Sequence, residues 1–374
     1  MFKLIKNVEI YNPRYIGKND ILICGEKIVK IAPNIDFPCD CIINKSGFIA
    51  IPGIIDQHIH ISGGGGEGGF STRTKEVGLS DLIKGGITTV VGLLGTDSIT
   101  QSVERLLAKA KALKMEGISA YCLTGSYHYP SLTITGSVMK DIAFIEEIIG
   151  VKLALSDHRE PHITSTELKK LASDVRIASM LGNKVGIITL HMGDDKKGLE
   201  MILSILKETS IPIHHFRPTH VTRCEKLFSD SLKFLSLGGY IDITVGKNYD
   251  ELMTHLTCID TSLYSHVTFS SDGNGSFSKY DKYGNIEKYG VQSCDGILKT
   301  IQYLVRKGYN LEECLPFGTS NVSSALNLTF KGYIDIGKDA DILLLDDEYE
   351  LDSVIAKGQI LMSNKEIIVY GTYE

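Results

Sequence analysis

The middle of the sequence, from Phe48 to Leu328, alternates short apolar runs rich in β-branched residues with longer amphipathic segments. Short runs of this kind are typical of buried strands, and the segments between them are long enough to be crossover helices. Eight runs predict strands, at Ile49–Asp56, Ile87–Leu93, Ile118–Thr124, Val151–Leu155, Gly186–Leu190, Ile213–Pro218, Tyr240–Thr244 and Val267–Ser270. Crossover helices are expected at Ile99–Met115, Ser165–Met180 and Val221–Leu237. Eight strand–helix alternations fit an α/β fold of the (β/α)8 TIM-like barrel type, which takes ~250 residues, better than an open doubly wound sheet.

Both ends of the chain carry shorter β patterns outside this central region. Near the amino terminus, Met1–Ile10, Ile21–Cys24 and Lys27–Ile31 read as strands, and near the carboxyl terminus Gly332–Gly337 and Asp341–Leu345 do so again. We expect the two ends to meet in one small β-sandwich domain. The predicted organisation is therefore a (β/α)8 barrel over residues 51–328, flanked by a small domain built from residues 1–50 and 329–374.

The composition is that of an ordinary folded protein. Of its 374 residues, 43% are hydrophobic and 22% charged, which favours neither disorder nor a membrane class. The net charge is −6 and the basic residues are scattered, so we expect no nucleic-acid partner. No apolar run approaches the ~20 residues of a membrane span, and the first ten residues do not resemble a signal peptide. We therefore expect a cytoplasmic protein with no membrane partner, whose eight cysteines, lacking any CxxC pair, are reduced structural thiols.

A His-x-His pair, His58 and His60, directly follows the first predicted barrel strand. Side chains alternate faces along a strand, so both imidazoles project to the same side. In a (β/α)8 barrel, the carboxyl ends of the strands form the mouth where active sites lie. Such a pair alone is more often structural than metal-binding, and its place at a strand end is what indicates a metal site.

Four further polar residues, Lys152, His191, His220 and Asp272, lie in or directly after other predicted strands. Taken singly, each has an ordinary interpretation: a lysine that reaches solvent, two satisfied histidines, and an aspartate in a turn. With the His-x-His pair, however, they mark the ends of strands one, four, five, six and eight in order. A lysine buried in a central strand has a lowered pKa, and its neutral amine can be carboxylated by carbon dioxide.

This series, led by Pro52-Gly-Ile-Ile-Asp56, resembles the amidohydrolase superfamily of binuclear metal hydrolases over nearly the whole chain. The resemblance implies six metal ligands: His58, His60 and Asp272 on the first metal, His191 and His220 on the second, and Lys152 between them as a carbamate formed with carbon dioxide. The cofactors implied are two divalent metal ions. Zn²⁺ is expected first from the ligand types, and Co²⁺, Mn²⁺ and Fe²⁺ suit the same ligands.

A second set of seven sequence motifs is similar to the motifs of the isoaspartyl dipeptidases, a family within this superfamily. In chain order they are Gly63-Gly-Gly-Gly-Glu67-Gly-Gly69, Gly95-Thr-Asp97, Thr124-Gly-Ser-Tyr-His-Tyr-Pro130, Ser156-Asp-His-Arg159, His191-Met-Gly193, Pro218-Thr-His-Val-Thr-Arg223 and Ser271-Asp-Gly-Asn-Gly-Ser276. The similarity implies that Glu67 pairs with the substrate's α-amino group, that Arg159 and Arg223 hold the carboxylate of the leaving amino acid, that Tyr127 assists the carbonyl oxygen, and that Gly65, Thr96 and Ser276 hold the aspartyl α-carboxylate.

The chemistry of these residue types agrees with such a substrate. A β-aspartyl dipeptide carries one ammonium and two carboxylates, so its pocket needs an acid together with fixed cations and donors. Arginine binds carboxylate through two parallel hydrogen bonds, and glycines let backbone amides approach an anion closely. Without the metal motif beside them, Glu67, Tyr127 and the two arginines are equally ordinary surface residues.

We therefore expect a metallo-dipeptidase that hydrolyses the isopeptide bond of β-aspartyl dipeptides and releases aspartate and an amino acid. A hydroxide bridging the two metals would attack the amide, and Asp272 would pass its proton to the leaving nitrogen. One alternative is another binuclear amidohydrolase acting on N-acyl amino acids or cyclic amides. A second is a non-enzymatic barrel that serves as an assembly scaffold. The resemblance further implies a homo-oligomer.

Overall fold

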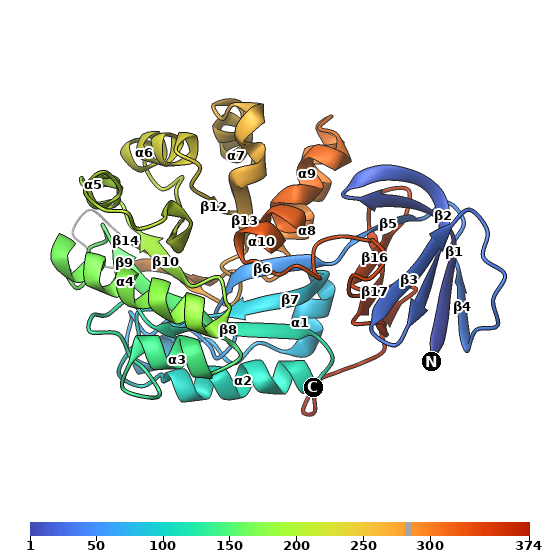
Figure 1. Ribbon diagram of the computed structural model, residues 1–374, viewed down its shortest axis with the longest axis horizontal. Helices are drawn as coiled ribbons and strands as arrows, with labels where there is room; N and C mark the ends of the chain where they lie inside the picture. Colours follow the sequence, from blue (N-terminus) through green and yellow to red (C-terminus); the bar gives the residue numbers. More distant parts are fainter. Residues whose placement is uncertain (281–285) are drawn as a thin grey trace.

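The computed structural model describes residues 1–280 and 286–374 and contains an eight-stranded parallel sheet that nearly closes into a barrel (Figure 1). Its strands are β6 (Ile54–Ile59), β7 (Ile87–Gly92), β8 (Ser119–Gly125), β9 (Ile148–Leu155), β10 (Ile187–Met192), β11 (Phe216–Thr219), β12 (Ile241–Thr244) and β13 (Val267–Ser270). They pair in sequence order, and a bridge from Ile59 to Gly273 brings the segment after β13 back to the end of β6. The predicted barrel is confirmed.

Helices follow the strands and cover the outside of the barrel (Figure 1). They are α1 (Leu79–Lys84), α2 (Val103–Met115), α3 (Val138–Phe144), α4 (Ser165–Gly182), α5 (Glu200–Glu208), α6 (Glu225–Ser236), α7 (Tyr249–Thr257), α8 (Gly296–Arg306), α9 (Leu311–Gly318) and α10 (Ser320–Ala325). Helix α2 starts later than predicted because the Ser102 hydroxyl accepts the Arg105 amide and caps the helix there. Within the described part of the chain, no helix combines the length and apolarity of a membrane span.

The first predicted strand, Ile49–Asp56, is divided between two sheets at Gly53. Strand β5 (Ile49–Pro52) pairs with strands of the small domain, and the barrel begins only with β6. A side chain at Gly53 would lie 2.2 Å from the Thr88 hydroxyl oxygen, so this close approach of two strands requires glycine. The sixth predicted strand is also shorter than expected, because Ile213–His215 forms a 3₁₀ turn ahead of β11.

The small domain is one nine-stranded sheet built from both chain ends. Besides β5, it contains β1 (Phe2–Asn12), β2 (Arg14–Cys24), β3 (Lys27–Ala32), β4 (Cys41–Asn44), β16 (Ile342–Leu345), β17 (Leu351–Ala356), β18 (Gln359–Ser363) and β19 (Glu366–Ile367). Buried residues from both ends, such as Ile10 and Ile355, belong to one apolar cluster, so the sheet closes over a shared core. The segment Gly332–Gly337, predicted as strand-like, is irregular.

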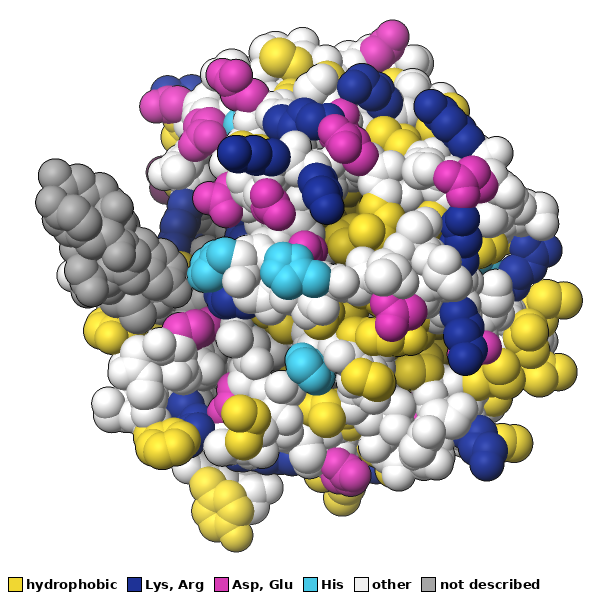
Figure 2. All heavy atoms as spheres, turned by 90° about the vertical axis from the view of Figure 1, so that its left-hand side faces the viewer, with side chains coloured by type: hydrophobic (Ala, Val, Ile, Leu, Met, Phe, Trp, Pro, Cys, Tyr) yellow, Lys and Arg dark blue, Asp and Glu magenta, His cyan; other side chains and the backbone are white. Residues whose placement is uncertain are grey.

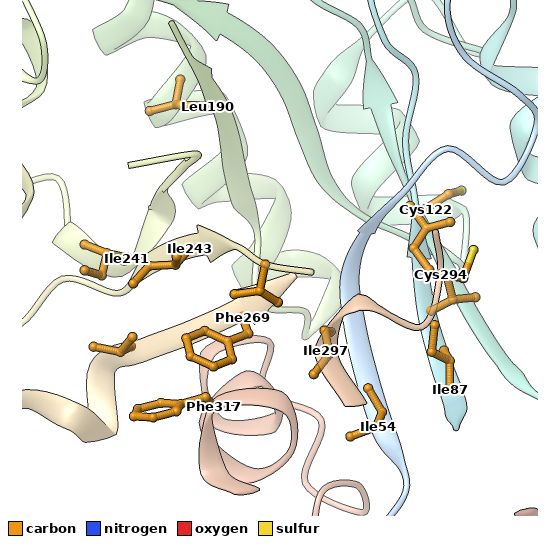
Figure 3. Packing of buried hydrophobic residues seen from close by; sticks show 14 of the residues in the cluster. Ile54, Ile87, Cys122, Leu190, Ile241, Ile243, Phe269, Cys294, Ile297 and Phe317 are labelled. Carbon is orange, nitrogen blue, oxygen red and sulfur yellow. The ribbon is translucent and has the colours of Figure 1, made fainter. Parts of the chain in front are cut away.

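The barrel core lies between the strands and the helices that cover them. Figure 3 shows Phe269 of β13 against Phe317 of α9, with ring centroids 4.7 Å apart, beside Ile54 of β6 and Ile297 of α8. Burying one such side chain contributes about 1.5–3 kcal/mol. This packing fixes the strands whose carboxyl ends carry the polar residues of the site.

Candidate active site

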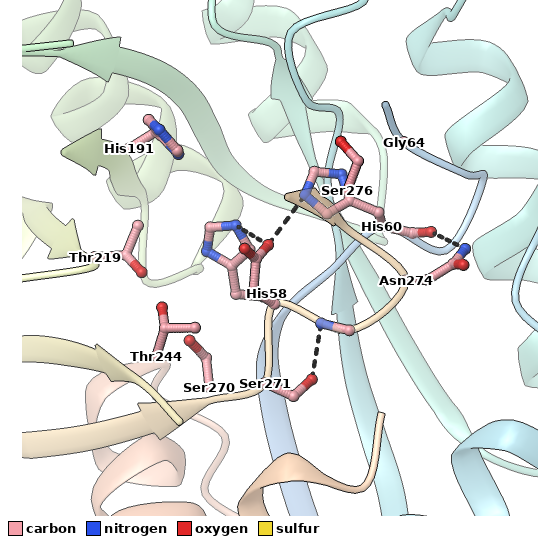
Figure 4. Close-up of polar contacts among 12 residues, drawn as sticks. His58, His60, Gly64, His191, Thr219, Thr244, Ser270, Ser271, Asn274 and Ser276 are labelled. Carbon is pink, nitrogen blue, oxygen red and sulfur yellow. Dashed lines mark hydrogen bonds and ion pairs between the residues drawn. The ribbon is translucent and has the colours of Figure 1, made fainter. Parts of the chain in front are cut away.

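The strand ends bring the predicted metal ligands into one cluster, and Figure 4 shows His58, His60 and His191 among them. His58 Nε2 lies 3.1 Å from Lys152 Nζ and 3.4 Å from Asp272 Oδ1. His60 Nε2 lies 3.2 Å from the same Asp272 oxygen. The His220 ring centroid is 5.0 Å from that of His58 and 4.6 Å from that of His191. Residues far apart in the sequence therefore meet at the mouth of the barrel.

Two of these residues, His220 and Asp272, follow their strands with a left-handed backbone. Their φ angles are 60° and 53°, a conformation that is uncommon for residues with a side chain and costs about 1–3 kcal/mol. The turn after β13 is held by Asn274, whose side-chain amide donates to the His60 carbonyl at 2.9 Å and to the Lys75 carbonyl at 2.7 Å. Strain held in place by surrounding contacts is typical of functional positions.

The metal-type cluster, formed by His58, His60, Lys152, His191, His220 and Asp272, has the ligand types of a divalent metal centre. His58 Nδ1, His60 Nδ1 and His220 Nε2 are buried with no hydrogen-bond partner among the described residues. Burial, together with nearby cations, lowers the pKa of His58, His191 and His220 well below the ordinary value, so the rings are neutral. Neutral imidazole and carboxylate are ligands of Zn²⁺ and related metals. Ligand atoms of His58, His220 and Asp272 all lie within 4.8 Å of one another.

Lys152 projects from β9 into the base of this cluster and has no exposed surface. Burial lowers the pKa of its amine to about 7, although the carboxylates of Asp272 and Asp242 act in the opposite direction. A lysine in water has a pKa of ~10.4 and is almost fully charged at neutral pH. The Lys152 nitrogen is therefore available as a neutral nucleophile under ordinary conditions.

Arg159 and Arg223, the two predicted carboxylate-binding arginines, both reach the buried carboxylate of Asp157. Arg159 donates to it through Nε and Nη2, each at 2.9 Å, and Arg223 donates through Nη1 at 3.4 Å. The sequence pattern did not single out Asp157. The available signal was a carboxylate two residues before Arg159, within the motif Ser156-Asp-His-Arg159.

Glu67 lies on the opposite side of Arg159 from Asp157. Its carboxylate accepts hydrogen bonds from the hydroxyls of Thr96 at 3.1 Å and Ser276 at 3.0 Å, and Arg159 Nη1 lies 3.4 Å away. The hydroxyls predicted to hold a substrate carboxylate thus donate to Glu67 in this structure. Gly65, with φ of +85°, passes so close to Ser276 that a side chain there would contact it at 3.2 Å.

Tyr127 places its hydroxyl oxygen 2.6 Å from His191 Nδ1 at the edge of the metal-type cluster. The ring is buried, and burial raises the pKa of the phenol far above its usual range, despite the opposing effect of Arg159 and Arg223. The phenol therefore keeps its proton at physiological pH. It is suited to donate a hydrogen bond to an oxygen that gains negative charge.

One cavity of about 870 Å³ joins these groups. Its walls include the predicted residues His60, Gly65, Glu67, Thr96, Tyr127, Arg159, His191, His220, Arg223, Asp272 and Ser276, while His58 and Lys152 are buried behind it. The sequence pattern missed a further part of the wall, formed by Lys247, Glu251, His255 and Phe277.

Strand β14 (Ser276–Tyr280), part of the cavity wall, lies on the side of the molecule away from the small domain (Figure 1). Figure 2 shows this side, where acidic and basic side chains are interspersed and histidines lie near the middle.

A parallel barrel whose mouth gathers neutral imidazoles, a carboxylate and a buried amine around one cavity is the arrangement of a barrel hydrolase. The chain belongs to the Amidohydrolase family, whose model matches residues 49–361, and it is a hydrolase.

The solved structures of similar proteins include close matches over the whole chain. Beta-aspartyl dipeptidase from Fervidobacterium islandicum AW-1, in complex with the beta-Asp-Leu dipeptide, is 41% identical, covers 98% of each chain and has a TM-score of 0.93. Dihydropyrimidinase from Brevibacillus agri shares the fold, at 18% identity over 99% of this chain and 97% of its own, with a TM-score of 0.69. A 5'-deoxyadenosine deaminase from Methanobrevibacter smithii is 24% identical over 97% of this chain and 93% of its own length. The similarity to isoaspartyl dipeptidases expected from the motifs is confirmed.

Proposed function

We propose that this hydrolase cleaves β-aspartyl dipeptides into aspartate and the second amino acid. The observation that carries the proposal is the set of charged groups on one cavity wall: Glu67, Arg159 and Arg223 beside the metal-type cluster. An acid and two arginines match the ammonium and the leaving carboxylate of such a substrate. The 41% identity to a beta-aspartyl dipeptidase solved with beta-Asp-Leu supports the same substrate class.

The residues that would hold two divalent metals are those of the cluster. We assign His58, His60 and Asp272 to one metal, His191 and His220 to the other, and carboxylated Lys152 to both. Zn²⁺ is the first candidate from the ligand types. Bound divalent metal ions supply a water of lowered pKa, near 7, for attack on the amide and polarise its carbonyl group.

Lys152 would become a ligand through a covalent step. Its neutral nitrogen attacks the carbon of carbon dioxide, an N–C bond forms, and one proton leaves the nitrogen, which gives an anionic carbamate with two oxygen donors. The lowered pKa of Lys152, about 7, supports this step because only the neutral amine reacts.

The protein's own groups bind the substrate and move its protons. Arg159 and Arg223 hold the leaving carboxylate, Glu67 pairs with the ammonium, and backbone at Gly65 with the hydroxyls of Thr96 and Ser276 holds the aspartyl carboxylate. This requires the Thr96 and Ser276 hydroxyls to turn from Glu67 to the substrate.

Two of the protein's own side chains, Asp272 and Tyr127, would then take part in the chemical step. Asp272 takes the proton of the attacking water on a carboxylate oxygen and delivers it to the leaving nitrogen, because an amine leaves readily only when protonated. The Tyr127 hydroxyl donates to the carbonyl oxygen as charge develops on it.

A substrate comparison tests the proposal. Metal-replete protein is assayed with β-Asp-Leu, α-Asp-Leu, an N-acyl-D-amino acid and a dihydropyrimidine, and β-Asp-Leu is expected to have the highest kcat/KM. Turnover of the N-acyl amino acid or the cyclic amide without β-Asp-Leu would show a different amidohydrolase specificity. No turnover of any amide by protein with both metals bound would favour a scaffold role. Light scattering in the same buffer tests the expected homo-oligomer.

A further inference from the structure

Asp157 lies just beyond the end of β9 and is only 2% exposed. Three of the side chains that its oxygens contact have different roles in the proposed reaction. Arg159 donates to both oxygens at 2.9 Å, Arg223 Nη1 lies 3.4 Å from Oδ2, and His191 Nε2 lies 3.1 Å from the same oxygen. One buried carboxylate therefore joins both carboxylate-binding arginines to a predicted metal ligand.

We propose that Asp157 is a positioning residue that orients Arg159 and Arg223 toward the leaving carboxylate and fixes the His191 ring for metal binding. The part of this proposal that concerns substrate binding rests on the proposed function. It assigns to Asp157 no direct contact with the reacting atoms.

The contact with His191 bears on where the proton of this neutral ring lies. Arg223 Nη1 and Arg159 Nη2 are donors that lie 2.9 Å and 3.3 Å from Nε2 and favour an unprotonated Nε2, whereas Asp157 is the acceptor there, at 3.1 Å, and favours Nε2–H. A proton on Nε2 leaves Nδ1, which lies 2.6 Å from the Tyr127 hydroxyl oxygen, unprotonated and able to act as a metal ligand. Metal-binding histidines generally donate their other ring N–H to a carboxylate in this way, and loss of the carboxylate costs about 10–100-fold in metal affinity.

The contacts of Asp157 with the two arginines set the orientation of Arg159 and the net charge around the leaving carboxylate. Asp157 occupies the Nε and Nη2 edge of Arg159, which leaves Nη1 directed toward Glu67 and the cavity. Once Glu67 pairs with the substrate's ammonium group, the two guanidinium groups and the Asp157 carboxylate leave one net positive charge, which matches the single carboxylate of a leaving amino acid.

The test compares β-Asp-Leu with β-Asp-leucinamide, which lacks only the leaving carboxylate. The native protein is expected to prefer β-Asp-Leu in kcat/KM. In Asp157→Asn we expect KM for β-Asp-Leu to rise at least tenfold, with a smaller fall in kcat, and the preference over the amide to shrink at least tenfold. The matched control is Asp347→Asn, the same change at an exposed position of the small domain, which should alter neither value by more than twofold.

Metal binding gives a second readout that does not need the proposed activity. Zn²⁺ titration of metal-free Asp157→Asn should show about 10–100-fold weaker binding at the second site. If native protein hydrolyses neither substrate, the proposed function fails, and this titration alone decides the role of Asp157 at His191. Zn²⁺ affinity and substrate preference both within twofold of native would overturn the proposal.

Chemical rescue separates positioning from a general effect on folding. Asp157→Ala removes the carboxylate, and added formate can replace it between the two arginines and His191. Formate should then restore part of the preference for β-Asp-Leu in Asp157→Ala, with no such gain in native protein. A variant that loses activity on both substrates equally, and does not respond to formate, would show that Asp157 serves only the local fold.

Discussion

Activation of the metal-free protein should depend on carbon dioxide, and the dependence should follow the protonation of Lys152. The amine has no exposed surface, and burial lowers its pKa to about 7. With that value, about 9% of the amines are neutral at pH 6 and about 91% at pH 8, whereas an ordinary lysine is only about 0.4% neutral at pH 8. Since only the neutral amine forms a carbamate, carboxylation at a fixed concentration of dissolved carbon dioxide should become about tenfold faster between pH 6 and pH 8.

The assay is reconstitution with Zn²⁺ after removal of metal, at pH 6, 7 and 8, with the concentration of dissolved carbon dioxide held the same at each pH or with carbon dioxide removed. We expect the initial rate of activity recovery at pH 8 to increase severalfold with carbon dioxide and to be lowest at pH 6. All samples are transferred to one assay pH, so that the pH dependence of catalysis does not enter.

Two variants make this prediction specific to Lys152. Lys152→Met should recover less than about 1% of native turnover, because the bridging ligand is absent. Lys247→Met changes another lysine of the cavity wall, whose pKa burial lowers to about 8, and should keep the dependence on carbon dioxide whatever its effect on turnover. Recovery that is independent of carbon dioxide at every pH, or full recovery by Lys152→Met, would refute the reasoning.

Three further predictions concern the site and the fold. Asp272→Ala should lower kcat by about 10²–10⁴-fold, because the proton carrier is lost, while metal analysis still finds metal on the histidines; near-native kcat would remove Asp272 from this role. Tyr127→Phe should lower kcat by about 10²–10³-fold with little change in KM, since the buried phenol donates to charge that develops during reaction; a change in KM alone would contradict this. Lys331→Met should lower the free energy of unfolding by about 3–5 kcal/mol in a denaturant titration, because the buried Asp341, 2.7 Å from the amine, loses its ion-pair partner, while the half-buried Asp339, also 2.7 Å away, keeps Lys27 at 2.6 Å. Its control, Lys365→Met, breaks a 2.8 Å pair at an exposed lysine and should cost under about 1 kcal/mol, and equal losses in the two variants would count against the buried cluster.

The barrel was predictable from the sequence because its strands are buried on both faces. Runs such as Ile87–Leu93 and Val267–Ser270 contain β-branched residues and no charged residue, and their positions agree with β7 and β13 to within one residue. Polar residues directly after such runs, including His220 and Asp272, had to lie at the same edge of a parallel sheet. The metal-type cluster follows from this regularity, although its division between two metals stays a prediction.

Contacts between distant segments decided what the sequence pattern could not. The run Ile49–Asp56 looks like one strand, yet the chain changes sheets at Gly53, because Pro52 pairs with Ile342 from the far end of the chain. Asp157 looks like a loop residue until the fold brings Arg223 and His191 to it.

The local pattern of the sequence thus determined the barrel, the strand ends and the residue types that gather there. Only the tertiary structure decided that the Lys152 amine has a pKa as low as about 7 and that one buried carboxylate serves both arginines and a histidine. The physical reason is that side-chain alternation depends on neighbours along the chain. Desolvation and the sharing of a hydrogen-bond acceptor depend instead on neighbours in space.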